Sequence, residues 1–344
     1  MISNNKLVVI VQDFPSPSKI YAMSYVLPRV KYYKQVGIDV VVVNISAKNN
    51  YIYDGISVIT IFDAKKIIKL NDILVLHAPN LRGHLRFLFA KNKKIIHFHG
   101  HEILWTFKTY PPPYKWEIIE FLKYIIRLIY DPFKISFWKI YFKYSSTKFI
   151  FISDNLLDRV IDIYGTEILG RSAVIPNPVA KIFIDQNYKI SHKKLDIIVI
   201  RKANSTYKFH EVIELAKKNP KINIDMYCGS SIQKLIPKNL RIKENFIRQS
   251  DIPALLDSYK CALMLSATDT QGVMACEIAV YGMPLIVSDT PGAKEFLADF
   301  SNVVISKDSD LNLCNLPQPR LIKSNASRFD PVYVCSKELA FYEF

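Results

Sequence analysis

The chain lacks the features that would mark a membrane-spanning, zinc-binding or disulfide-stabilised protein. Nowhere do about 18 uncharged apolar residues follow one another, which argues against a transmembrane helix. The five cysteines are widely spaced and include no CxxC pair, so they indicate neither a zinc site nor a disulfide framework. A reducing compartment fits this cysteine usage best.

Acidic residues are scarce beside basic ones. The chain has 46 Lys and Arg against 31 Asp and Glu, a formal net charge of +15. Such an excess favours anionic partners, among them nucleic acid, acidic lipid and phosphorylated small molecules, and charge alone does not choose among them.

The sequence also shows no long biased segment and no candidate export signal. The N-terminus has only a four-residue apolar run, which is shorter than the core of a signal peptide and predicts a buried first strand. Half of the residues are hydrophobic, as in a globular protein. At roughly 150 residues per domain, a chain of 344 residues is expected to form two domains.

Short β-rich runs alternate with helical stretches through both halves of the chain. In the first half we expect a helix at about 20–35 and strands at 6–11, 38–44, 57–61, 73–77, 94–99, 149–153 and 173–175. In the second half we expect strands at 195–201, 222–228, 262–265 and 284–288, with helices at 209–218, 252–258 and 274–281. The alternation predicts an α/β protein with two Rossmann-like domains facing each other across a cleft. Ligands of open α/β sheets bind at the carboxyl ends of the strands, so function is expected in that cleft.

One loop in the second half has the composition of a nucleotide diphosphate site. The segment Asp269-Thr-Gln-Gly-Val-Met-Ala-Cys-Glu277 follows an expected strand and opens a helix. Gly272 lets the backbone approach a ligand closely, and the N–H groups that begin the helix suit a pyrophosphate. Glu277, about one turn further in, is placed to accept hydrogen bonds from ribose hydroxyls. The residues expected to bind the nucleotide are Thr270, Gln271, Gly272, Val273 and Glu277.

The spacing of the two acidic residues, together with the Gly-Met-Pro that leads into the next strand, resembles the acidic-x7-Glu signature of glycosyltransferase family 4, which has the GT-B fold. The resemblance extends from about residue 6 to about residue 296. The other matching positions are Pro176-Asn177-Pro178-Val179, Ile152-Ser153, His99-Gly100, Arg201 and Lys208.

The sequence departs from the family pattern at three places. The first acidic residue is Asp269 where Glu is usual, and Arg201 and Lys208 are seven apart where the family usually has five. Lys202 is therefore a second candidate for the phosphate-binding cation. The glycine-rich loop often found after the first strand is absent.

The resemblance implies retaining transfer of a sugar from a nucleoside diphosphate sugar, with no metal and no cofactor. It implies that Arg201, with Lys208 or Lys202, stabilises negative charge on the leaving phosphate. It also implies that His99 orients the sugar and that Asp269 contacts sugar hydroxyls or supports charge at the anomeric carbon.

Ordinary structural roles compete with each of these assignments. Glu277 alone would be read as a solvated helix residue, but its neighbours are apolar, and an unpaired charge there would be costly. His97, His99 and His101 alternate and so could share a strand face as metal ligands, yet no second ligand cluster accompanies them. The basic residues after the first strand of the second half could be plain surface charges.

A segment rich in aromatic and basic residues spans about 111–146. From Lys108 to Lys148 there are eight Lys and Arg against three acids. We expect two amphipathic helices that break near Asp131-Pro132, with the composition of a segment at a membrane interface. Packing as an ordinary helix pair is the alternative.

These observations predict an N-terminal acceptor-side domain over 1–182, a nucleotide-sugar domain over 183–325 and a C-terminal helix over 326–344 that packs back on the first domain. The function expected is glycosyl transfer in bacterial surface polysaccharide synthesis, with a glycan or lipid-linked acceptor, in the cytoplasm at the inner face of the plasma membrane. Two alternatives stay open. One is a GT-B sugar-nucleotide epimerase, and the other is a basic nucleic-acid-binding protein, although no zinc-finger, RNP or helix-turn-helix signature accompanies the charge.

Overall fold

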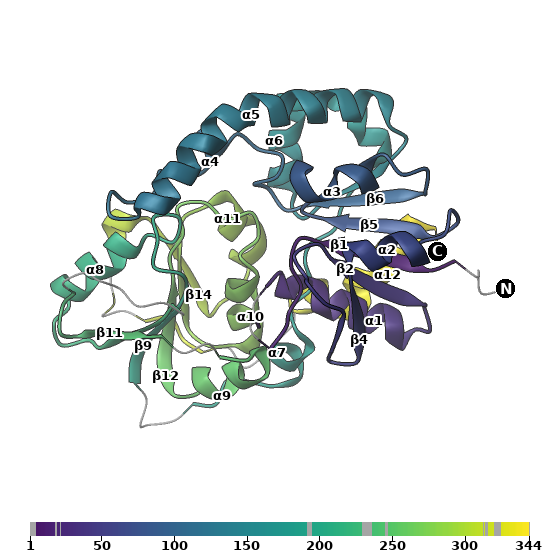
Figure 1. Cartoon of the computed structure of the whole chain (residues 1–344). Helices are drawn as coiled ribbons and strands as arrows, with labels where there is room; N and C mark the ends of the chain where they lie inside the picture. The colour runs from purple at the N-terminus through teal and green to yellow at the C-terminus, as the bar shows by residue number, and fades with distance from the viewer. Residues whose placement is uncertain are drawn as a thin grey trace. The chain divides into compact units, whose positions relative to one another are not determined.

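The computed structural model divides the chain into two compact units. It describes residues 5–17, 19–20, 22–190, 195–228, 236–244, 247–311, 313, 316–319 and 325–343. Unit 1 consists of residues 1–105, 130–178 and 328–344, and unit 2 consists of residues 106–129 and 179–327. Each unit is an α/β structure built on one sheet, so the expected fold class is confirmed (Figure 1).

Unit 1 contains an eight-stranded sheet in the order β3-β4-β2-β1-β5-β6-β7-β8. Its pairs are parallel except for β3 with β4. The strands are β1 Leu7–Val11, β2 Val40–Asn44, β3 Tyr51–Tyr53, β4 Ile56–Thr60, β5 Ile73–His77, β6 Lys94–Phe98, β7 Lys148–Phe151 and β8 Ser172–Val174. All seven strands expected in the first half are present, and β3 was not expected.

The first helix of unit 1 begins later than expected. A 3₁₀ turn at Ser24–Val26 leads into α1 at Leu27–Gln35, with a proline in the first helical turn. Proline is favoured at that position, where its missing N–H has no helical partner, so the helix starts there and not near residue 20. The remaining helices between residues 61 and 185 are α2 Ile61–Ile67, α3 Leu81–Leu88, α4 Thr106–Thr109, α5 Ile118–Tyr144, α6 Asp154–Tyr164 and α7 Lys181–Asp185.

The expected pair of helices around Pro132 is wrong, because α5 runs unbroken from Ile118 to Tyr144 (Figure 1). Proline inside a helix removes one hydrogen bond and usually bends or ends it. Here the turns after Pro132 are fixed by packing: Ile135, Trp138, Tyr141 and Phe142 are buried in the core of unit 1. That tertiary packing outweighs the local preference of proline.

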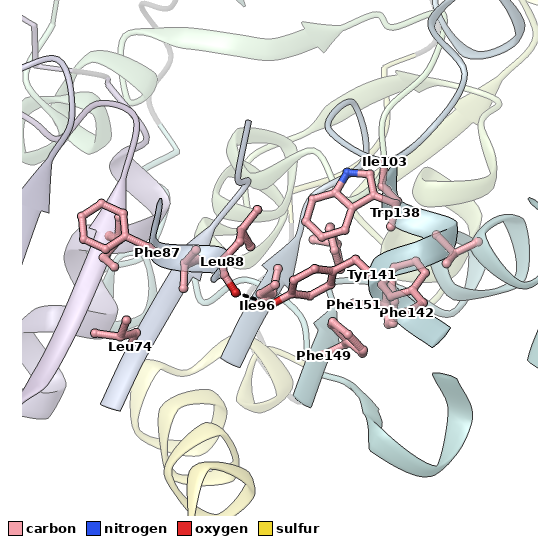
Figure 2. Packing of buried hydrophobic residues seen from close by; sticks show 14 of the residues in the cluster. Leu74, Phe87, Leu88, Ile96, Ile103, Trp138, Tyr141, Phe142, Phe149 and Phe151 are labelled. Atoms are coloured by element: carbon pink, nitrogen blue, oxygen red, sulfur yellow. Dashed lines mark hydrogen bonds between the residues drawn. The ribbon is translucent and has the colours of Figure 1, made fainter. Parts of the chain in front are cut away.

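One face of the unit 1 sheet is covered by an aromatic core. Figure 2 shows Trp138, Tyr141 and Phe142 of α5 packed with Phe149 and Phe151 of β7. The Tyr141 hydroxyl donates to the Leu88 carbonyl at 3.1 Å, which joins α5 to the end of α3. The strands are apolar on both faces, as expected for a sheet covered on both sides.

The other face of the unit 1 sheet receives the C-terminal helix. This helix, α12 at Pro331–Tyr342, buries Val334, Cys335 and Tyr342 in the same core cluster as Val30 and Tyr33 of α1. Its N-cap is Asp330, whose carboxylate accepts from the Val332 N–H at 2.7 Å.

Unit 2 contains a six-stranded parallel sheet in the order β11-β10-β9-β12-β13-β14. The strands are β9 Leu195–Ile200, β10 Ile224–Tyr227, β11 Leu240–Lys243, β12 Tyr259–Met264, β13 Leu285–Ser288 and β14 Val303–Ser306. The helices are α8 Phe209–Lys218, α9 Ile252–Leu256, α10 Val273–Tyr281 and α11 Pro291–Leu297.

Residues 106–129 group with unit 2, whereas the sequence suggested a place in the N-terminal domain. Tyr114 accounts for part of this, because its hydroxyl accepts from the His210 N–H at 2.9 Å and its ring packs on the core of unit 2. Within the described ranges, no helix combines the length and the apolar character that crossing a bilayer requires.

Candidate active site

The loop that follows β9 presents a basic side chain. Arg201 comes directly after the strand and donates from Nη2 to Asp269 Oδ2 at 3.1 Å. Its guanidinium also lies over the Tyr207 ring, 4.6 Å from the centroid. The Nε atom is buried and has no hydrogen-bond partner in the described part of the chain. Arg201 is thus fixed by Asp269 and Tyr207, and it retains a donor for which the described residues supply no acceptor.

Lys208 ends the same loop in an unusual conformation. Its φ is +49°, in the left-handed region, and it caps the start of α8. Its ammonium group binds Asp308, with Nζ–Oδ distances of 2.6 and 2.7 Å. Lys202, the alternative cation, is exposed. A phosphate at Lys208 would therefore have to share or displace Asp308.

The acidic loop after β12 turns sharply into α10. Gly272 is the N-cap of the helix with φ +65°, and as a glycine it offers the first turn no side-chain cap. A Cβ at Gly272 would lie 2.9 Å from Asp269 Oδ2, so only glycine fits the turn without displacing that carboxylate. Gly272, Val273 and Met274 are partly exposed, which leaves this helix start within reach of an anion.

The start of α11 supports this loop from behind. Thr290 caps α11 by accepting from the Ala293 N–H at 3.2 Å. A Cβ at Gly292 would come within 2.3 Å of the Asp269 carbonyl oxygen and 2.7 Å of the Thr270 carbonyl oxygen. Because the backbone at Gly292 lies so close to the backbone of the acidic loop, the start of α11 fixes the position of that loop relative to the sheet.

The two loops of unit 2 meet. The Ala267 N–H donates to the Thr206 carbonyl at 2.8 Å, which ties the acidic loop to the loop that carries Arg201. A small pocket opens where they join, and its walls include Arg201, Asp269, Gln271, Gly272, Ser288 and Thr290. Both loops lie at the carboxyl ends of their strands, where open α/β sheets bind ligands.

Glu277 is 1 % exposed, in the interior of α10. Its Oε1 accepts from the Gln249 Nε2 at 2.8 Å and from the Ala180 N–H at 3.2 Å. Burial raises the pKa of the Glu277 carboxyl to about 7, although both hydrogen bonds oppose that shift. Gln249 was not among the residues named from the sequence. A polar residue at the start of a three-residue 3₁₀ helix carries no pattern that would single it out.

His99 lies in unit 1, directly after β6. Its N–H and that of Gly100 both donate to Glu102 Oε1, so a carboxylate fixes the turn after the strand. The Tyr25 ring lies against the imidazole with centroids 4.4 Å apart. Burial lowers the pKa of His99 to about 3, so the imidazole is neutral at physiological pH.

The alternating histidines do not converge on a common point. His97 is fully buried and its Nε2 contacts the Tyr342 hydroxyl at 2.6 Å, whereas the His101 side chain is 70 % exposed and pairs with Glu102. Across the described residues, no group of three His, Cys, Asp or Glu side chains is placed to hold a metal ion.

The structure therefore brings together part of the residue set expected from the sequence. Arg201 and Asp269 are in direct contact, and the loop residues Thr270, Gln271, Gly272 and Val273 adjoin them in unit 2. Glu277 lies behind them, inside α10. His99 belongs to unit 1.

Comparison with known proteins agrees with this architecture. Residues 180–312 match the family model "Glycosyl transferases group 1". No curated protein sequence matches the chain.

Among solved structures, HepE of Anabaena in complex with UDP and glucose is 12% identical with a TM-score of 0.66, covering 98% of this chain and 100% of that one. Sucrose-phosphate synthase from Thermosynechococcus elongatus is 10% identical with a TM-score of 0.63, covering 98% and 94%. The α,α-trehalose 6-phosphate synthase of Burkholderia multivorans is 10% identical with a TM-score of 0.61, covering 98% of both chains.

These structural likenesses establish the fold, which is GT-B. The glycosyltransferase activity is indicated by the family-model match, because the matched residues include the loops that carry Arg201, Asp269 and Gly272. The chain is a glycosyltransferase of GT-B fold in which residues 180–312 match the group 1 glycosyltransferase model.

Proposed function

We propose that the protein is a retaining glycosyltransferase of family 4 type, which transfers a sugar from a nucleoside diphosphate sugar to a glycan or lipid-linked acceptor. The observation that carries the proposal is the contact between the Arg201 loop and the acidic loop that opens α10. A guanidinium beside an uncapped helix start is an arrangement suited to a diphosphate.

The proposed chemistry uses these groups as a substitute for a metal ion. The bond between the anomeric carbon and the diphosphate oxygen breaks, and a bond from the acceptor oxygen to the same carbon forms. The acceptor proton passes to the departing diphosphate. Arg201, Lys208 and the backbone N–H groups near Gly272 stabilise the charge that develops on that diphosphate, at about 3–4 kcal/mol for a well-placed donor.

Other residues hold the two ends of the donor. Glu277 accepts hydrogen bonds from the ribose hydroxyls, which requires its carboxyl to be ionised. Asp269 contacts sugar hydroxyls or supports charge at the anomeric carbon, and its contact with Arg201 keeps it in place. His99, neutral and wedged against Tyr25, orients the sugar.

A donor screen tests the proposal. Thermal unfolding of the protein is measured with a panel of nucleoside diphosphate sugars, and one of them is expected to stabilise it by about 2.7 kcal/mol at 100 times its dissociation constant. The transferred sugar is then expected to keep its anomeric configuration, which NMR of the product reads directly. Inverted product would disprove the retaining mechanism, and the absence of any stabilising donor would disprove the donor class.

The acceptor class that we propose is a bacterial surface polysaccharide precursor anchored in the plasma membrane, because α5 carries an apolar face with no protein partner in the described structure. This face, the α5 stripe, consists of Ile118, Leu122, Ile125, Ile129 and Phe133. Their spacing places them on one side of the helix. Ile129 and Phe133 are 76% and 75% exposed. A contiguous row of exposed apolar side chains marks an interaction surface, whereas single exposed ones are ordinary.

The charges on α5 favour an anionic bilayer as the occupant of the stripe. Lys139 and Lys143 lie along the edge of the stripe further on, whereas Lys123 and Arg127 lie on the opposite side, where Lys123 pairs with Glu120 at 2.6 Å. Long basic side chains can reach the phosphate level of a bilayer while the apolar stripe enters it. We therefore propose that the protein binds the inner face of the plasma membrane through α5.

Vesicle flotation tests the stripe. The wild-type protein is expected to float with vesicles that contain phosphatidylglycerol and to stay behind with pure phosphatidylcholine. Ile129→Asp is expected to weaken binding roughly tenfold or more, because it removes a large apolar side chain that the bilayer would bury and adds a charge there. Ile52→Asp is the matched control, since Ile52 is equally exposed at 75% but lies on β3.

Two outcomes would contradict the membrane assignment. One is equal flotation of the two variants. The other is a wild-type dimer in solution that Ile129→Asp dissociates, with no flotation in either protein, because the stripe would then be covered by a second copy of the chain.

A further inference from the structure

A network of buried polar side chains lies within the otherwise apolar core of unit 1. Arg29 of α1 and Glu338 of α12 are both fully buried, and Arg29 Nε donates to Glu338 Oε1 at 2.8 Å. The Tyr33 hydroxyl donates to the second carboxylate oxygen of Glu338. Buried ion pairs stabilise proteins little compared with apolar packing, because both charges lose their hydration. The network therefore calls for a reason other than stability.

One branch of the network leads from Glu338 to His99. Arg29, oriented by Glu338, donates from Nη1 to the Tyr25 carbonyl at 2.9 Å. The Tyr25 ring lies 4.4 Å from the His99 ring. The guanidinium also reaches the Pro176 carbonyl at 3.4 Å, so that it binds two main-chain segments at once. A displacement of Glu338 would be transmitted to one face of the His99 imidazole.

A second branch leads from Tyr342 to His99. The Tyr342 hydroxyl contacts His97 Nε2 at 2.6 Å and the Tyr33 hydroxyl at 3.2 Å. The His97 ring packs on the His77 ring with centroids 4.2 Å apart, and His77 lies opposite His97 in the register of β5 and β6. His77 Nδ1 in turn contacts His99 Nε2 at 3.4 Å.

The two branches therefore meet on the same imidazole, one on its ring face and one on its Nε2 atom. A neutral imidazole carries a single N–H, and the hydrogen bonds of its neighbours decide which nitrogen holds it. Burial keeps the pKa values of His77, His97 and His99 below their ordinary range, so all three are neutral and this choice of tautomer is open at each.

We propose that α12 is a positioning element for His99, in which Glu338 and Tyr342 hold the imidazole in one orientation, against the His77 nitrogen that sets its tautomer. The inference rests on the role proposed above for His99. It extends the site to a helix that begins more than 200 residues after β6 and contributes no atom to the reaction. Neither residue is a catalytic residue, because each acts through the histidine.

Tyr342→Phe tests the inference with the smallest possible change. It removes one hydroxyl and keeps the ring that packs against Tyr33 of α1. We expect kcat to fall roughly tenfold, and up to the hundredfold that a displaced catalytic group can cost, while the donor KM stays unchanged. Tyr333→Phe is the matched control, because Tyr333 is on the same helix and its ring contacts Lys337 at the surface.

A double-mutant cycle separates positioning from general stability. In a His99→Ala background, Tyr342→Phe is expected to cause no further loss of kcat, because the group that it positions is gone. If Tyr342→Phe lowers kcat equally in both backgrounds, or behaves like Tyr333→Phe in the wild-type background, the positioning role is wrong while the proposed function stands. If His99→Ala itself transfers sugar at the wild-type rate, the role proposed for His99 and this inference fail together.

Nitrogen NMR of the histidine rings gives a test that depends on neither variant activity nor variant folding. The wild-type protein is expected to show His99 as a single neutral tautomer, with one protonated and one unprotonated ring nitrogen. Chemical shifts averaged between the two tautomers in the wild type would overturn the inference.

Discussion

Replacing Arg201 with alanine is expected to lower kcat by about 100-fold to 1,000-fold, the cost of removing one preorganised donor to a developing oxyanion. Arg201 is suited to this role because Asp269 and Tyr207 hold its guanidinium, while Nε has no acceptor among the residues that the structure describes. The donor is bound in the ground state by other groups as well, so its dissociation constant is expected to change less than kcat. Single-turnover kinetics with the donor found by the thermal screen measure both quantities.

Two neighbouring substitutions serve as controls for Arg201. Lys202→Ala is expected to leave kcat near the wild-type value, because the Lys202 side chain is exposed. Arg201→Lys is expected to recover only part of the loss, since an ammonium group is a point charge and cannot bind Asp269 and a phosphate with the geometry of a guanidinium. Full activity in Arg201→Ala, or an equal loss in Lys202→Ala, would contradict the assignment.

Glu277→Ala is expected to weaken donor binding by about 10-fold to 100-fold, because a hydrogen bond to a charged group contributes about 1.5–3 kcal/mol. The fold is expected to survive, with a loss of stability from the Gln249 amide and the Ala180 N–H, which lose their acceptor. Calorimetric titration with the donor measures the affinity. Glu214→Ala is the control, since Glu214 is an exposed glutamate on α8 that pairs with Lys217. Wild-type affinity in Glu277→Ala would refute the ribose role.

The raised pKa of Glu277 also predicts how donor affinity and stability depend on pH. With a pKa of about 7 in the folded protein, the carboxyl loses its charge as the pH falls from 8 to 6, and donor affinity is expected to fall with it. Its contribution to stability without donor has the opposite sign. A carboxyl whose pKa is raised by folding stabilises the folded state at low pH, and this stabilisation is lost as the pH rises through 7. Glu277→Gln is expected to remove both trends.

The strands and the acidic loop were predictable because their patterns are local. Parallel strands covered on both faces appear as short apolar runs, and β5 and α8 have the expected bounds. The turn at Gly272 was also predictable. This glycine lies eight residues after a strand and directly before a helix, which indicates a left-handed backbone and an open helix start.

Features that depend on distant partners were not predictable. Pro132 indicated a helix break, but the burial of Trp138 and its neighbours keeps α5 continuous. Glu338 looks like any solvated glutamate of a terminal helix until Arg29, more than 300 residues earlier, lies against it. Likewise nothing near Lys208 in the sequence indicates its ion pair with Asp308. Charge pairs of this kind carry no periodicity, so only the folded chain reveals them.

The position of α12 in unit 1 also determines the order in which the two units can complete their folding during synthesis. The strands of unit 1 leave the ribosome first, but the core around Tyr33 stays incomplete until Val334, Cys335 and Tyr342 arrive. Until then the Arg29 guanidinium has no counter-ion and cannot be buried without a large penalty. Unit 2, whose sheet is contributed by one uninterrupted stretch of chain, can be completed earlier. The half of the protein made first is therefore the half that matures last, and a sheet with one face still partly uncovered is the species that chaperones would meet.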